Sequence, residues 1–195
     1  MAKIGLKNIH YAIMDASHQD SPTDSPQYGT IKTPNCGAIQ IDMQVNVSEA
    51  KLYADNKLWA SSREFTDGTI TLDIADLPMD MAADLLGNTY SSTDKTLIKK
   101  ASDNPPYVAL AGEFNTADGG KLCFWLYKVK FSENAQNGQT KGENTAYQTN
   151  SMTGTFTALK GAGDNTDRWQ YNKEFASNAD TASFYTSIPL ATVTP

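Results

Sequence analysis

The chain has 195 residues, a length that suits one β-rich domain whose core is large enough to fold without disulfide bonds. Its composition, 39% hydrophobic and 19% charged, is that of a folded globular protein rather than a disordered one. The net charge of −6 argues against nucleic-acid binding that depends on neutralising phosphates. No apolar run reaches the length of a signal peptide or a membrane span, so we expect a protein kept in a cytosol unless a larger assembly carries it out.

The first 75 residues predict two alternating strands separated by a long connection. Residues 4–14 are rich in β-branched and aromatic side chains and predict a first strand, followed by a polar, turn-rich loop over 15–36. Strict alternation of apolar and polar residues over 39–48 predicts a strand buried on one face, and the pattern returns over 69–74. The stretch between them, 49–67, is predicted to be a long loop, and such length is typical of a functional arm.

One helix is predicted over about residues 77–87. Asp76 or Leu77 is expected to cap it, with Pro78 in the first turn and Gly87 at its end. Its apolar stripe is expected to comprise Met79, Ala82, Ala83 and Leu86. Its exposed face is expected to carry Asp80 and Asp84.

The second half predicts four further strands and a weakly patterned tail. Strands are expected over 96–99, 106–114, 121–131 and 148–159. The run 122–127 is apolar on both faces, so its strand should be central and covered on each side, with the helix on one of them. In the last segment, 160–195, the expected anchors are Trp169, Phe175, Phe184 and Tyr185.

These elements predict a single domain, 1–195, that is mainly β. The expected architecture is a β-sandwich or partly closed barrel with one flanking helix. The long loops, 15–36 and 49–67, and the segment 160–195 are its less regular parts.

The chemistry-bearing residues form no recognisable catalytic pattern. The histidines are His10, in the first predicted strand, and His18, in a polar loop, and no nucleophile or phosphate-binding motif accompanies them. Cys36 and Cys123 lack the spacing of a zinc site or a disulfide framework, so both are expected to be free thiols. We therefore expect a protein that is not an enzyme, with no catalytic residue, metal or cofactor.

Two residue groups suggest binding sites but have simpler structural interpretations. The carboxylates Asp73, Asp76, Asp80 and Asp84 would suit a metal or glycosidase site, yet their spacing favours a helix cap and an exposed helix face. Trp59, Trp125 and Trp169 would suit a sugar-binding platform, yet Trp125 lies in the two-sided apolar run and is expected in the core.

Charge is distributed unevenly along the chain. Residues 1–94 carry 13 acidic and 6 basic side chains, whereas residues 95–130 carry 6 basic and 3 acidic ones. The two regions could meet across a repeated interface between copies of the chain, although solvated faces explain the same numbers equally well.

Seven sequence blocks, in order over residues 1–158, carry a resemblance to the major tail proteins, or tail tube proteins, of long-tailed phages of Gram-positive hosts. The blocks are MAKIGLKNIHYA (1–12), AKLYADN (50–56), IADLP with LLG (74–78 and 85–87), NPPYVA (104–109), WLYKVKF (125–131), TKGE (140–143) and TNSMTGTF (149–156). The last 37 residues match loosely, and the loop after the first strand is longer and richer in Pro and Ser than the family pattern.

The resemblance implies a structural virion protein. Six sandwich-like or barrel-like subunits would form a ring whose inner strands enclose a lumen, and rings would stack around a tape-measure protein, with tail terminator and distal tail proteins as further partners. DNA would pass through during ejection without specific binding. The protein would assemble in the host cytoplasm and reside in the phage tail.

The family pattern also implies where rings make contact. Members place a long loop between two early strands against the adjacent ring, and 49–67 fits that description. The predicted ring-stacking arm is defined by Leu52, Tyr53, Leu58 and Trp59, and the loop 15–36 is the second possibility.

Three polar strand faces are predicted to line the lumen, because they carry no Lys or Arg that would hold DNA phosphates. The predicted lumen face comprises Gln40, Asp42, Gln44, Asn46, Thr69, Thr71, Asp73, Thr149, Ser151, Thr153 and Thr155. The alternative is that these are ordinary solvated outer faces of a sandwich.

A second hypothesis comes from another functional class. A soluble β-sandwich module could bind carbohydrate or a receptor through Trp59 or Trp169. Such a module would stay monomeric, whereas a tube protein would form rings or polymers.

Overall fold

The computed structural model describes residues 2–16, 20, 26–133, 140, 149–161 and 165–190. In chain order its elements are β1 (Lys3–Ile13), β2 (Ala38–Ala54), β3 (Lys57–Ile74), α1 (Met79–Leu86), β4 (Thr89–Ser91), β5 (Thr96–Ile98), β6 (Val108–Thr116), β7 (Lys121–Phe131), β8 (Asn150–Phe156), β9 (Gln170–Phe175) and the short 3₁₀ helix η2 (Ala182–Tyr185). The chain is therefore mainly β with one α-helix, as predicted. In the part of the chain that the structure describes, no helix is long and apolar enough to cross a lipid bilayer.

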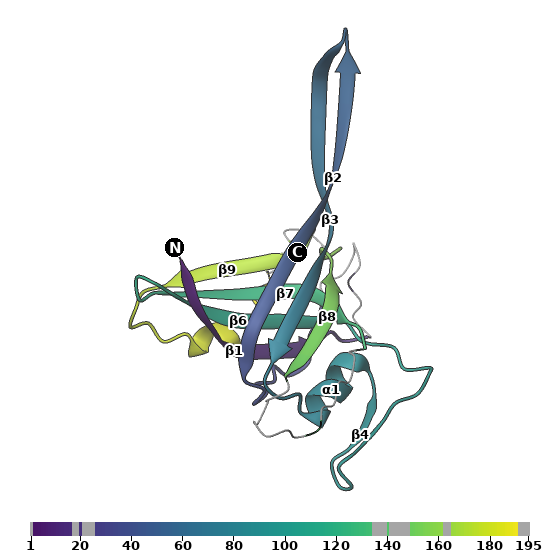
Figure 1. Ribbon diagram of the computed structural model, residues 1–195, viewed down its shortest axis with the longest axis vertical. Coiled ribbons are helices and arrows are strands. Elements are labelled where there is room, and N and C mark those ends of the chain that lie inside the picture. The colour runs from purple at the N-terminus through teal and green to yellow at the C-terminus, as the bar shows by residue number, and fades with distance from the viewer. Residues whose placement is uncertain are drawn as a thin grey trace, which may run out of the picture.

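Seven strands form one antiparallel sheet. Its order is β1-β6-β7-β8-β3-β2, and β9 pairs with the first half of β7. In Figure 1, β6, β7 and β9 run across the direction of β2, β3 and β8, so the sheet folds over into two layers. The sheet does not close into a barrel. The hairpin of β4 and β5 lies apart from it, beside α1.

β7 is the central strand, and both of its faces are buried. Phe124 points into the core between the two layers, where Met81 and Leu85 of α1 complete the cluster. Trp125 is fully buried on the other face, and its indole N–H donates to the carbonyl oxygen of Phe184 at 3.3 Å. The predicted central strand, with the helix over one face, is confirmed.

α1 differs from the predicted helix in its start and its capping. Gly87 ends the helix with a φ of 72°, the left-handed conformation expected of a C-terminal glycine. Pro78 occupies the N-cap position, and no side chain caps the free amides. The prediction of Asp76 or Leu77 as the cap was therefore wrong, because the helix begins at Met79 and its N-cap is Pro78.

The faces of α1 also differ from the prediction. Met79 is exposed, whereas the buried side comprises Met81, Ala82, Ala83, Leu85 and Leu86. Asp84 is not simply solvated, because the Tyr11 hydroxyl donates to it at 2.6 Å and the Lys32 ammonium pairs with it. This carboxylate therefore ties the helix to β1 and to the chain that follows β1.

The segment 49–67 is a β-hairpin rather than a loop. β2 and β3 remain paired along their whole length, and Asp55 and Asn56 make the two-residue turn with φ values of 50° and 61°. Positive φ at both positions is the geometry of a tight hairpin turn, and Asn and Asp adopt it more readily than most residues. In Figure 1 this hairpin projects well beyond the body of the subunit.

The loop 15–36 lies partly outside the described residues, and so does His18. Its described end runs beside β1 through two isolated bridges, Tyr11 with Lys32 and Met14 with Tyr28. Cys36 and Cys123 are free and buried.

The C-terminal segment covers the outer face of β6 and β7. Among the expected anchors, Phe184 and Tyr185 are buried against Trp125, and Trp169 stacks on both Phe65 and Phe156, which also stack on each other. The described part of the segment thus packs on the body at more positions than its weak sequence pattern suggested.

A buried carboxylate helps to fasten this segment. Glu113 of β6 is fully buried, and the Thr181 hydroxyl donates to it at 2.7 Å from the C-terminal segment. Lys7 and Asn8 of β1 approach it at 3.2 and 3.3 Å. Burial alone would raise the pKa of Glu113, but the hydrogen bonds from Thr181, Lys7 and Asn8 outweigh it and lower the pKa below 4.5.

This lowered pKa predicts an acid-sensitive stability. The ionised carboxylate contributes fully above its ordinary pKa of 4.5, and the contribution is lost as the pH falls through the lower folded-state pKa. Glu113→Gln should therefore be less stable than the wild type at neutral pH and should lose less on further acidification. Thermal midpoints between about pH 7 and pH 3 test this, with the exposed Glu174→Gln as control. If the thermal midpoints of wild type and Glu113→Gln fell in parallel as the pH was lowered, the stabilising role of the ionised Glu113 would be contradicted.

Gly68 marks the point where β3 leaves the body of the sheet. The Phe156 ring lies directly over it, and a Cβ built on Gly68 would come within 2.1 Å of the ring's Cζ. The same ring stacks on Phe65 and Trp169, with centroids 6.2 and 5.5 Å away. A side chain at Gly68 would therefore displace an aromatic cluster that secures the base of the projecting hairpin.

We expect Gly68→Ala to lower the free energy of unfolding by roughly 1–3 kcal/mol, the range typical of overpacked cores. Chemical denaturation measures the change. Gly5→Ala is the matched control, because Gly5 is also in a strand but its nearest neighbour, an Asn115 side-chain atom, is 3.7 Å from the built Cβ. An unchanged midpoint for Gly68→Ala would show that the ring moves freely.

Candidate assembly surfaces

The predicted lumen residues come together on one face of three adjacent strands. Antiparallel partners point to the same side of a sheet, so the register of β2, β3 and β8 decides which residues are neighbours. Their rows are Gln40–Asp73–Ser151, Asp42–Thr71–Thr153 and Gln44–Thr69–Thr155. Asn46 lies opposite Asp67 in the next row, and Thr149 comes just before β8. We call this surface the polar face.

The polar face is solvated because the other side of the same strands forms the core. Ile70, Leu72 and Ile74 of β3 and Met152 of β8 alternate with the polar residues and are fully buried. The period-two alternation in the sequence therefore has a direct cause, because one side packs on α1 and β7 and the other packs on nothing within the described subunit.

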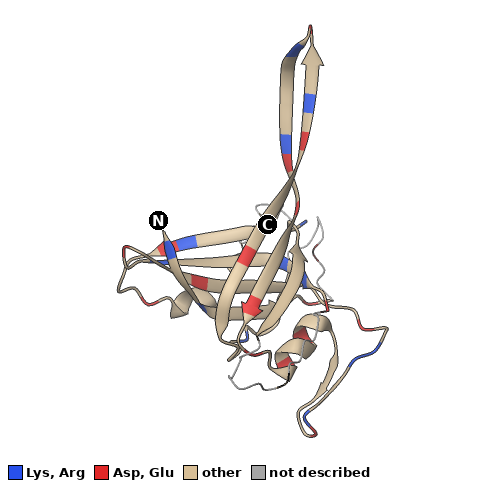
Figure 2. Ribbon diagram, viewed as in Figure 1, with Lys and Arg blue, Asp and Glu red and all other residues tan. Residues whose placement is uncertain are grey.

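Carboxylates dominate the charge of the polar face. Asp42 accepts a hydrogen bond from Gln40 at 2.7 Å, and Asp67 accepts one from Asn46 at 2.8 Å. Figure 2 shows acidic positions on the parts of β2 and β3 that lie in the body of the subunit. Lys130 of β7 lies opposite Thr155, so the face has a basic residue at its border. The sequence could not reveal Lys130 as a neighbour, because its strand pairs with β8 over three residues only.

The polar face is bounded by two strand edges with unused hydrogen-bonding groups. β2 pairs with β3 on one side and, in the described chain, with no strand on the other. β8 pairs with β3 along its length, but with β7 only from Gly154 to Phe156. The Ser132 N–H also donates to the Thr153 carbonyl oxygen at 2.9 Å, so within the described residues Asn150 to Met152 present a second edge. Unpaired edges of this kind are ready templates for pairing with another chain.

The second surface is the projecting hairpin, which we call the arm and define as residues 48–64. Its apolar side chains are exposed, with exposed fractions of 59% for Leu52, 65% for Tyr53, 53% for Leu58 and 73% for Trp59. Glu49 pairs with Lys51 and with Arg63 at 3.4 and 3.5 Å on one side of the arm. So much exposed apolar area on a two-stranded ribbon indicates a contact surface.

The other sequence-level candidates do not gather into a site. Trp125 is buried, Trp169 is in the aromatic stack and Trp59 is on the arm, so the three tryptophans share no surface. Within the described residues, no group of His, Cys, Asp and Glu could hold a metal ion. His10 stacks on Tyr185 at 4.1 Å, and its Nδ1 hydrogen-bonds the Thr33 hydroxyl. Burial lowers the pKa of His10, although the charge of Glu113 opposes this shift.

A comparison with protein families identifies the chain. The family described as phage tail tube protein matches residues 1–188. The chain belongs to this family. A search of curated proteins finds no match. The resemblance predicted from the sequence blocks is thereby confirmed at the level of the tail tube family, and the protein has a structural role in a phage tail.

Tail tube membership gives the two surfaces a common context. A tube subunit must contact copies of itself sideways and lengthwise, and the structure offers strand edges beside the polar face and an arm that extends away from the body. The residues predicted from the sequence to line the lumen and to stack rings lie on these two surfaces, and their roles remain predictions. The sequence did not show that the arm is a continuous extension of the same two strands, because a short apolar pair such as Leu58 and Trp59 shows no alternation long enough to indicate a strand.

Proposed function

We propose that the protein forms hexameric rings that stack into a tail tube and conduct DNA during ejection. The observation that carries the proposal is the polar face, three strands wide, bounded in the described chain by the unpaired edge of β2 and the partly unpaired edge of β8. Pairing the β2 edge of one subunit with the β8 edge of the next would continue the sheet around a ring and place all the polar faces together. The family membership supports the tube; the six-fold ring follows from the resemblance.

The polar face suits passage of a polyanion. Asp42 and Asp73 are fixed negative charges, and the hydroxyl rows between them hydrogen-bond water without attracting phosphate. A Lys or Arg contact would be repeated in every subunit of every ring, and such contacts accumulate into strong binding. At physiological salt the Debye length is about 8 Å, so the carboxylates act close to the wall, where friction would arise.

Reversal of these charges tests DNA conduction. Asp42→Lys with Asp73→Lys should leave tube assembly largely intact and slow or block genome ejection, more severely at low salt, because each added cation attracts phosphate. The measurement is the rate and extent of DNA release in vitro from particles whose tails contain only the variant. The neutral pair Asp42→Asn with Asp73→Asn is the control for loss of the carboxylates alone. Normal ejection with the lysine pair would refute the lumen assignment.

The arm is proposed to join successive rings. Leu58→Ala with Trp59→Ala should leave a folded subunit with an unchanged thermal midpoint, because both side chains are exposed, but should prevent long tubes from forming. Negative-stain microscopy and light scattering distinguish rings from tubes. Lys57→Ala, also at the arm's end, is the matched control. Long tubes from the double variant would show that the arm does not stack rings.

Partners beyond the subunit itself follow from the same proposal. A tape-measure protein would occupy the lumen during assembly, and tail terminator and distal tail proteins would meet the two ends of the tube. The family membership favours the tube over the rival binding module, and Trp169 is held in a stack with Phe65 and Phe156, which leaves the exposed Trp59 as that module's candidate residue.

A further inference from the structure

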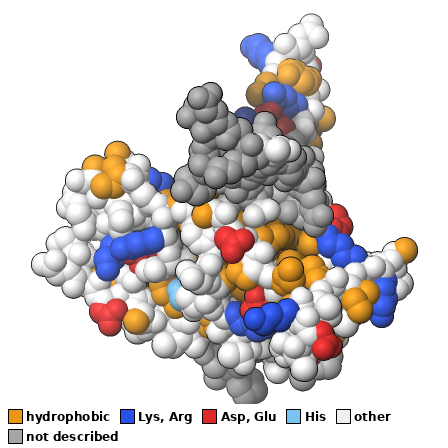
Figure 3. Space-filling model, turned by 60° about the horizontal axis from the view of Figure 1, so that its bottom comes forward, with side chains coloured by type: hydrophobic (Ala, Val, Ile, Leu, Met, Phe, Trp, Pro, Cys, Tyr) orange, Lys and Arg blue, Asp and Glu red, His pale blue; other side chains and the backbone are white. Residues whose placement is uncertain are grey.

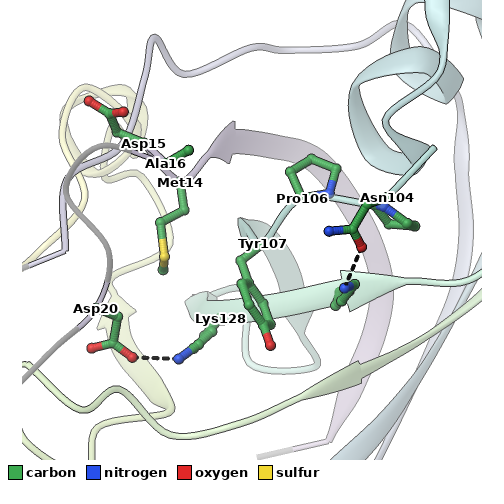
Figure 4. Close-up of a pocket in the computed structure, with 10 residues that line it drawn as sticks. Met14, Asp15, Ala16, Asp20, Asn104, Pro106, Tyr107 and Lys128 are labelled. Carbon is green, nitrogen blue, oxygen red and sulfur yellow. Dashed lines mark hydrogen bonds and ion pairs between the residues drawn. The ribbon is translucent and has the colours of Figure 1, made fainter. Parts of the chain in front are cut away.

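A pocket lies on the body of the subunit, between the end of β1, the chain leading into β6, and β7. It is a cavity of about 250 Å³, which can hold one large aromatic side chain. Figure 4 shows Met14, Asp20, Tyr107 and Lys128 around a common space, whereas the Asp15 carboxylate points away from it. Its apolar lining residues are Met14, Ala16, Pro105, Pro106 and Tyr107, and its polar ones are Asp15, Asp20, Asn104, Lys128 and Lys130.

Two ammonium groups flank the Tyr107 ring in this pocket. Lys128 lies 4.9 Å and Lys130 5.5 Å from the ring centroid. Lys128 is neutralised by an ion pair with the buried carboxylate of Asp20. Lys130 donates to the neutral side chain of Asn104 at 2.9 Å and pairs with no carboxylate among the described residues. Asp15 and Asp20 also line the pocket, so it holds as many carboxylates as ammonium groups, but Lys130 is an ammonium group without a direct carboxylate partner among the described residues, and it lies beside an exposed aromatic ring.

The position of the pocket is fixed by α1. The backbone of Asn104 packs against Gly87, where a Cβ would come within 2.5 Å of the Asn104 carbonyl oxygen. The pocket thus adjoins the C-terminal end of α1, and in Figure 1 α1 lies at the end of the molecule away from the tip of the arm. Figure 3, with that end turned forward, shows hydrophobic side chains gathered near the middle of this face with charged side chains around them.

The tip of the arm has the complementary features. Asp55 is exposed at the turn and makes no hydrogen bond or ion pair with any described residue. Tyr53 and Trp59, on either side of the turn, are among the most exposed large side chains of the chain. The tip therefore carries a carboxylate without a direct partner and two exposed aromatic rings, with Lys57 also beside the turn, whereas the pocket carries an ammonium group without a direct carboxylate partner and several apolar side chains.

We propose that this pocket receives the arm tip of a copy in the adjacent ring, with an aromatic side chain of the tip against the exposed Tyr107 ring and Asp55 beside Lys130. The inference rests on the proposed stacking by the arm and names its receiving site. Opposite ends of one subunit meet head to tail, so the same contact repeats along the tube without closing on itself. Pairing Asp55 with Lys130 selects the correct register of the tip, since in a misplaced tip neither residue meets its oppositely charged partner.

A charge exchange tests the pairing. Asp55→Lys and Lys130→Glu should each raise the protein concentration needed for tube formation by roughly five-fold, because each places like charges together. The double variant restores opposite charges and should return to within about two-fold of the wild type. Lys100→Glu is the matched control, because Lys100 is exposed on the same part of the chain but outside the pocket. The pairing would be overturned if the double variant raised the protein concentration needed for tube formation by the product of the two single-variant factors.

Engineered disulfides test the contact independently of charge. Both native cysteines are buried, so cysteines introduced at Asn56 and Asn104 would be the reactive ones. Tubes of Asn56→Cys with Asn104→Cys should give a ladder of covalent multimers on oxidation, since each tip is linked to the next subunit's pocket. Asn56→Cys with Ser177→Cys should not, because Ser177 lies near the β6–β7 turn, away from the pocket.

The outcomes separate this inference from the function beneath it. Tubes that form normally but give no ladder from the Asn56 and Asn104 pair would overturn the receiving site and leave the tube proposal standing. A wild-type protein that remains monomeric at every concentration would overturn both. A ladder from the Ser177 pair instead would place the tip elsewhere on the neighbouring copy and refute the pocket.

Discussion

The burial of β7 on both faces is the constraint on which the rest of the subunit depends. A strand with apolar side chains on each side requires two covering layers. β3, β8 and α1 supply one of them, and the C-terminal segment supplies the other through Phe184 and Tyr185. The remaining strands are added around this central strand, so the polar face and the arm are consequences of what is left uncovered once β7 is enclosed.

The arm depends on the body in a second way. A two-stranded ribbon in water is only marginally stable alone, and no third strand of the described chain pairs with the arm over residues 48–64. Its base is secured where Phe65, Phe156 and Trp169 stack beside Gly68, and a shift of register between Asn46 and Val47 separates the arm from the body. Such a shift strengthens the local twist of a ribbon. The aromatic stack and the twist together set the direction in which the arm leaves the subunit.

Much of this structure was predictable where the sequence has a regular period. The two-sided run around Trp125 identified a strand buried on both faces, and the glycine after Leu86 identified the end of the helix. The alternation over 39–48 identified a strand, but the prediction that its apolar face is buried was only partly right, because Ile41 and Met43 are half-buried whereas Ile39, Val45 and Val47 are exposed. The register that places Asp42, Thr71 and Thr153 in one row depends on contacts between distant strands and could not be read from any single segment. The predicted position of the N-cap was wrong for a related reason. The packing of α1 on the sheet, rather than the carboxylate of Asp76, fixes where the helix begins.

The continuity of β2 from the body into the arm has a geometric consequence for the tube. Successive residues of a strand face opposite sides and advance by about 3.3 Å each, so the arm can lengthen or shorten only by two residues per strand, or about 7 Å, without exchanging its faces. A change of one residue would turn Leu52 and its neighbours to the other side of the ribbon. The length of the arm can therefore change only in steps of two residues per strand if its two faces are to be kept. Any axial spacing that the arm sets between subunits changes in the same steps.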